Sequence, residues 1–106
     1  MSAGSSHLVE ILLPKETGTG QPVSQKWFES LLKELTEQFG GATSFVRASG
    51  QGLWRSGIGV ERDSIAVIEV MTEELDRDFW QTLRGRLERE LSQDEIIIRA
   101  HEMTIL

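Results

Sequence analysis

Apolar and polar residues follow two different periods along the chain, and these periods predict its strands and helices. Residues 64–72 (SIAVIEVMT) are apolar on both faces except at Glu69, a pattern typical of a central strand covered on both sides. Residues 7–13 (HLVEILL) alternate, and Glu10 is the only charge on one of the two faces. Both segments are predicted to be strands whose charged positions are costly to bury without a partner.

Two further stretches have the helical period. Apolar residues recur at helical spacing between Ser24 and Phe39, where Ser24 is a plausible N-cap and Gly40-Gly41 provides a left-handed stop. A second helix is predicted to begin after Asp76, whose side chain would cap its free N–H groups. The buried stripe of the second helix is predicted to be Leu75, Phe79, Trp80, Leu83, Leu87 and Leu91.

Two more segments read as strands. Residues 42–54 are predicted to form a strand interrupted near Gly50 and Gly52, and residues 96–105 form the last strand. The segment 15–22 carries glycines but neither of the common phosphate-binding patterns, so it is interpreted as a mobile connection.

The resulting order, β-α-β-β-α-β, predicts an α+β fold. Right-handed crossovers place both helices on one face of an antiparallel sheet, which gives a ferredoxin-like sandwich with strand order 4-1-3-2. A chain of 106 residues is expected to form one domain, residues 1–106, with residues 1–6 disordered.

The two faces of this sheet are predicted from the positions of the charges. The charge-free side of each strand is assigned to the helices: Val9, Ile11, Leu13, Ala66, Ile68, Val70, Ile96, Ile98 and Ala100. The other side is expected to form an open face, whose apolar residues would be Leu8, Leu12, Ile65, Val67, Met71, Ile97 and Met103. Such a patch is large for a monomer to expose, which favours a partner that covers it.

A row of charges is expected to cross this open face. In the order 4-1-3-2, Arg99 and His101 come first, followed by Glu10, Glu69 and Arg47. Three interpretations compete: an ion-pair lattice, a dimer interface, and an active or ligand site. In the third, Glu10, Glu69 and His101 are the catalytic candidates.

The binding candidates for such a site are Arg47, Arg99 and Trp54. Trp54 would either cap one end of the sheet or line a pocket beside the open face. Too few potential ligands are visible for a metal site, and no cofactor is expected.

Charge and composition narrow the class of function. The net charge of −6 argues against nucleic-acid and anionic-membrane binding, both of which rest on lysine and arginine. The chain has no cysteine, which excludes disulfides and thiolate chemistry. It has no long apolar run and no signal-peptide pattern, so a cytoplasmic protein is expected.

Several segments together resemble a family of small, uncharacterised bacterial proteins. They are residues 52–55 (GLWR), residues 68–76 (IEVMTEELD), Trp80 with Arg84 and Leu87-Glu88, and residues 93–100 (QDEIIIRA). The resemblance implies a ferredoxin-like fold and carries no activity or functional residue. At the level of architecture, the chain is also similar to dimeric α+β-barrel proteins, which include cofactor-free oxygenases, and to small regulatory ligand-binding domains.

The sequence therefore predicts a homodimer or partner-binding module that uses its open sheet face. The alternative is a small cofactor-free enzyme or ligand-binding domain with its site on that face, built from Glu10, Glu69, Arg99 and His101.

Overall fold

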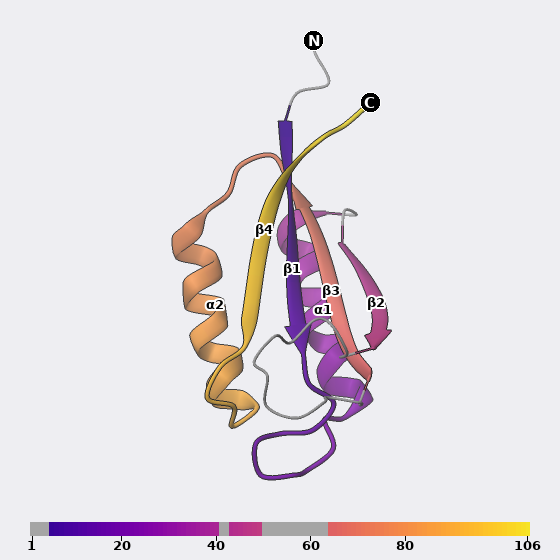
Figure 1. Cartoon of the computed structure of the whole chain (residues 1–106), viewed down its shortest axis with the longest axis vertical. Helices are drawn as coiled ribbons and strands as arrows, with labels where there is room; N and C mark the ends of the chain where they lie inside the picture. Colours follow the sequence, from indigo (N-terminus) through magenta and orange to yellow (C-terminus); the bar gives the residue numbers. More distant parts are fainter. Residues whose placement is uncertain (1–4, 41–42, 50–63) are drawn as a thin grey trace.

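A computed structural model describes residues 5–40, 43–49 and 64–106 of the chain. In chain order, the strands and helices are β1 (Ser5–Leu13), α1 (Gln25–Phe39), β2 (Thr43–Ser49), β3 (Ser64–Thr72), α2 (Arg77–Glu90) and β4 (Ile97–Thr104) (Figure 1). The predicted α+β class is confirmed, and the arrangement is compatible with a ferredoxin-like fold. The predicted strand over residues 42–54 is described only as β2, and its two glycines lie outside the described residues.

The antiparallel sheet is organised around β1, which lies between β3 and β4. The register places Glu10 of β1 directly opposite Glu69 of β3 on one side and opposite Arg99 of β4 on the other. The backbone of β2 pairs with the other edge of β3, so the order across the sheet is β2-β3-β1-β4.

Both helices begin where their capping residues predict. The Oγ of Ser24 accepts a hydrogen bond from the backbone N–H of Trp27 at 3.1 Å. At the start of α2, Oδ1 of Asp76 accepts one from the N–H of Phe79, also at 3.1 Å. Gly40 follows α1 with φ of 77°, a left-handed conformation that favours glycine.

The helices cover one face of the sheet, and the predicted stripes form its core. The buried residues of this core are Val9, Ile11, Leu13, Phe28, Leu31, Leu35, Ala66, Ile68, Val70, Trp80, Leu83, Leu87, Leu91 and Ile96. Ala100 was expected among them, but it is exposed, and Ile98 is only half-buried. The reason is position, because β4 lies at the edge of the sheet and, among the described strands, has β1 alone as its neighbour.

A second apolar cluster lies on the opposite face. Leu12, Ile65 and Val67 expose only 0%, 3% and 6% of their surface, and Ile97 packs against them. The prediction that these residues form an open apolar patch is therefore wrong. Their apolar area is already removed from water within one chain, so they do not require a second copy to cover them.

The connection between β1 and α1 is anchored, contrary to the expectation of a mobile segment. The backbone N–H of Gly18 donates to the carbonyl oxygen of Leu91 at 2.9 Å. The side chain of Gln93 donates to the carbonyl oxygen of Glu16 at 3.1 Å. The loop thus packs against the turn that follows α2.

Candidate functional site

An ion pair between neighbouring strands occupies the centre of the open face. The Nε of Arg99 donates to Oε1 of Glu10 at 2.8 Å, and the two residues are directly opposite in the register of β1 and β4. The Glu10 side chain is 15% exposed, whereas that of Arg99 is 47% exposed. A charge-assisted hydrogen bond of this length fixes the orientation of the Glu10 carboxylate.

Two carboxylates stand side by side on this face. Glu10 and Glu69 are opposite one another on β1 and β3, which places their Cβ atoms about 4.5–5.5 Å apart. Glu69 is partly buried and makes an interaction of its own. Like charges directly opposite one another destabilise a sheet, and here each of the two carboxylates has a further contact, that of Glu10 being Arg99.

The border of the carboxylate pair is apolar on one side and carries a histidine. Leu8 is opposite both Met71 of β3 and His101 of β4. Met71 is 42% exposed, and His101 is also exposed. Two residues along β4 from Arg99, His101 occupies the same face, so an imidazole lies beside the carboxylate centre.

The predicted row of charges does not extend to Arg47 on β2. The residue opposite Glu69 on β2 is Ser44, while Arg47 is opposite Ala66. Ala66 belongs to the helix-covered face, so Arg47 has the register of that face and not of the open face, and its predicted place in the row of charges is wrong. Trp54, the other binding candidate, lies outside the described residues.

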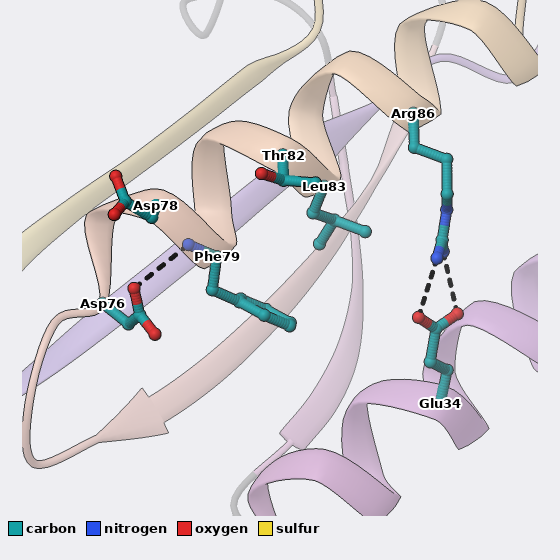
Figure 2. Close-up of a pocket in the computed structure, with 7 residues that line it drawn as sticks. All are labelled: Glu34, Asp76, Asp78, Phe79, Thr82, Leu83 and Arg86. Atoms are coloured by element: carbon teal, nitrogen blue, oxygen red, sulfur yellow. Dashed lines mark hydrogen bonds and ion pairs between the residues drawn. The ribbon is translucent and has the colours of Figure 1, made fainter.

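Sequence reasoning missed a hollow between the two helices, on the other side of the molecule. It has a volume of about 480 Å³, and its lining residues are Glu34, Asp76, Asp78, Phe79, Thr82, Leu83 and Arg86. Figure 2 shows that Arg86 of α2 reaches across to Glu34 of α1, with Nη1 to Oε2 at 2.9 Å and Nη2 to Oε1 at 2.8 Å. Asp76 is occupied as the cap of α2. Glu34 and Arg86 are 52 residues apart in the sequence, so their contact could not be predicted without knowing that the two helices pack side by side.

The bidentate contact shifts the pKa of both partners. The hydrogen bonds from Arg86 lower the pKa of the Glu34 carboxyl below its ordinary value, against a smaller opposing effect of burial. The same hydrogen bonds raise the pKa of the Arg86 guanidinium. Glu34 and Arg86 thus pair with each other across the hollow, and their contact joins the two helices.

Glu34→Gln tests this role. A lowered pKa in the folded state means that the stabilisation is present above the pKa of the unfolded chain and is lost as the pH falls through the folded pKa. Because both side chains are partly exposed, solvent screening limits the expected loss at neutral pH to about 0.5 kcal/mol. Urea unfolding at neutral and acidic pH should show this difference shrinking with acid. Glu37→Gln, an exposed change on the same helix, should show no such trend.

Neither a metal site nor a membrane-spanning helix is found among the described residues. In the described ranges, no group of three or more histidine, aspartate or glutamate side chains is placed to hold a metal ion. Neither helix that the structure describes is both long enough and apolar enough to cross a membrane.

Comparisons with known proteins identify the fold and no family. No family model matches the sequence, and no curated protein matches it. Among solved structures, the chain is similar to a phage SAM lyase in complex with S-methyl-5'-thioadenosine, with a TM-score of 0.60 and 14% sequence identity. The alignment covers 96% of this chain and 92% of the lyase chain, so the similarity extends over the whole fold.

Proposed function

We propose that the protein binds a small, positively charged molecule on the open face of its sheet. The observation that carries this proposal is the register of Glu10 and Glu69, which sets two carboxylates directly opposite one another. Two carboxylates set opposite one another form a local concentration of negative charge that attracts a cation. Arg99 contacts Glu10 from one side and Glu69 has an interaction of its own, and a ligand cation above the pair would add to these contacts.

The surroundings of the pair suit a small molecule with an apolar part. The carboxylates lie beside the buried cluster of Leu12, Ile65 and Val67, and partial burial strengthens an electrostatic contact relative to open water. Leu8 and Met71 border the other end of the pair. A ligand that combines a cation with an apolar ring or chain would contact the carboxylates together with the accessible side chains of Leu8 and Met71.

The structural neighbour suggests a ligand class. The lyase of the same fold acts on SAM, whose sulfonium and ammonium groups are cations, and it was solved with S-methyl-5'-thioadenosine, whose sulfur is neutral. We therefore propose adenosyl sulfonium compounds as the ligand class for this chain. This assignment rests on fold similarity together with the charge of the site.

Calorimetric titration with SAM and, separately, with S-methyl-5'-thioadenosine tests the proposal. Binding of SAM is expected to be the tighter of the two, because only SAM offers cations to the carboxylates. Glu69→Gln should weaken SAM binding by about tenfold and leave S-methyl-5'-thioadenosine binding nearly unchanged. Glu37→Gln, which makes the same chemical change on the exposed side of α1, is the matched control and should alter neither affinity.

Either of two results would overturn the proposal: no binding of SAM at millimolar concentration, or binding that Glu69→Gln and Glu10→Gln leave unchanged. The same samples distinguish a binding protein from an enzyme. Formation of S-methyl-5'-thioadenosine from SAM, abolished by Glu69→Gln, would indicate cleavage of the ligand. Binding without product would indicate a ligand-binding domain.

A second candidate function is self-association through the same face, as the sequence suggested. The exposed Met71 and the half-buried Leu8 are neighbours across β1 and β3, and they form an apolar area that one chain leaves accessible. A homodimer that packs two open faces together would bury these residues. In that case Met71→Glu should lower the molar mass in solution from that of a dimer to that of a monomer.

The finer fold assignment is also part of this proposal. We assign the chain to the ferredoxin-like βαββαβ class with strand order 4-1-3-2, and the backbone pairing of β2 with β3 supports the assignment. A cytoplasmic location is proposed with it, on the sequence features alone.

A further inference from the structure

Strand β4 presents an unpaired edge. Within the described residues it pairs with β1 alone, so its outer side leaves backbone N–H and C=O groups without strand partners. The middle of the strand, from Arg99 to Glu102, is exposed. Edges of this kind invite pairing with another strand.

A groove with cationic walls runs beside this edge, between α2 and β4. It has a volume of about 240 Å³, and its lining residues are Val9, Leu75, Arg77, Trp80, Gln81, Arg84, Ile98, Arg99 and Ala100. Arg84 makes a weak contact with Glu88, with Nε 3.9 Å from Oε2. In the part of the chain that the structure describes, Arg77 has no ion pair within 4.0 Å. The groove therefore has positive charge available for an anion.

The same strand carries a carboxylate that matches the groove. Glu102 is opposite His7 in the register, two steps beyond the pair of Ala100 and Val9, so it shares the helix-covered face with the groove. It is exposed, and among the described residues it too has no ion pair within 4.0 Å. The edge thus carries a cationic residue, Arg84, and an anionic residue, Glu102, that do not pair with each other within one chain.

We propose that the partner of this edge is a second copy of the chain, paired antiparallel through β4 about a two-fold axis at Ala100. A register centred on one residue keeps the helices of both copies on the same side of a continuous sheet. It places Glu102 of each copy opposite Ile98 of the other, at the groove that Arg84 lines. Ala100 is small enough to meet its own copy at the axis.

The remaining pairs in this register are compatible with association. On the open face, Ile97 meets Met103 of the second copy, which joins two apolar side chains that each chain leaves half-buried. Arg99 meets His101 of the second copy, which brings a second imidazole to the edge of the Glu10 site. The interface is distinct from the open-face dimer, and it does not depend on the ligand proposed above.

Light scattering over a range of protein concentrations tests the edge dimer. The wild-type protein is expected to approach twice 11.9 kDa as concentration rises. Glu102→Arg should raise the dissociation constant by about tenfold or more, since the charge change occurs twice in a symmetric interface. Combining it with Arg84→Glu, which exchanges the two charges, should restore association. Glu37→Arg makes the same charge change on α1, away from the edge, and should leave the mass unchanged.

Three outcomes would overturn the edge dimer. The first is a wild-type protein that stays at 11.9 kDa at millimolar concentration. The second is a dimer that Met71→Glu dissociates and Glu102→Arg does not, because this would place the interface on the open face. The third is a Glu102→Arg variant whose weakened association is not recovered by Arg84→Glu, because the loss would then not arise from the proposed charge pair.

Discussion

Replacing Gly18 with alanine is expected to lower the free energy of unfolding by about 2–3 kcal/mol. The methyl group would overlap the backbone carbonyl oxygen of Ser92, and a backbone atom yields far less than a flexible side chain. The chain is held close at this point by the hydrogen bond from Gly18 to Leu91. Ser92 itself has φ of 53°, so the turn that receives the loop is already in an uncommon conformation. Urea unfolding measures the change.

The matched control is Gly20→Ala in the same loop. Gly20 has φ of 86°, and no atom lies within 4 Å of an added Cβ, so its substitution costs only backbone strain, about 1 kcal/mol. Equal losses at the two glycines would contradict the packing of this loop against the turn after α2. A much larger loss at Gly18 would establish that the loop is part of the folded structure.

The second large effect is expected at Leu12. Leu12→Ala should lower the free energy of unfolding by about 2–5 kcal/mol, because its side chain is fully buried in the cluster with Ile65 and Val67. The cost combines lost burial with the cavity left behind. This residue lies on the sheet face away from the helices, so the experiment tests whether that face has a core of its own. Thermal and urea unfolding both report the change.

Leu8→Ala provides the comparison, since Leu8 lies on the same strand and the same face. It is only half-buried, and its removal should cost about 1 kcal/mol. Similar small losses in the free energy of unfolding for both variants would mean that Leu12 is open to solvent. The whole face would then be exposed, as the sequence predicted.

Leu12 also shows what the hydrophobic pattern can predict and what it cannot. Alternation assigns each residue of a strand to a face, and every helix-side assignment on β1 and β3 is confirmed. Alternation does not tell whether more of the chain covers the second face, because that depends on contacts between residues far apart in sequence. The helix limits were predicted more closely, since Ser24 and Asp76 act through hydrogen bonds to residues three positions away.

The candidate site was predicted only in part. Glu10 and Arg99 were expected together because the topology makes their strands neighbours, and the structure joins them by a hydrogen bond. Arg47 was misplaced because the register of β2 against β3 cannot be read from a segment with no clear alternation of charge. The contact of Gly18 with the turn at Ser92 had no signal in the sequence beyond the glycine itself.

A titration of isotope-labelled protein with SAM, followed by amide chemical shifts, locates the binding site on the fold. We expect the largest shifts at the backbone amides around Glu10, Glu69 and Arg99, on three neighbouring strands of one face. Shifts concentrated instead on the helices around Glu34 and Arg86, or no shifts at saturating concentration, would contradict a cation-binding site on the open face of the sheet.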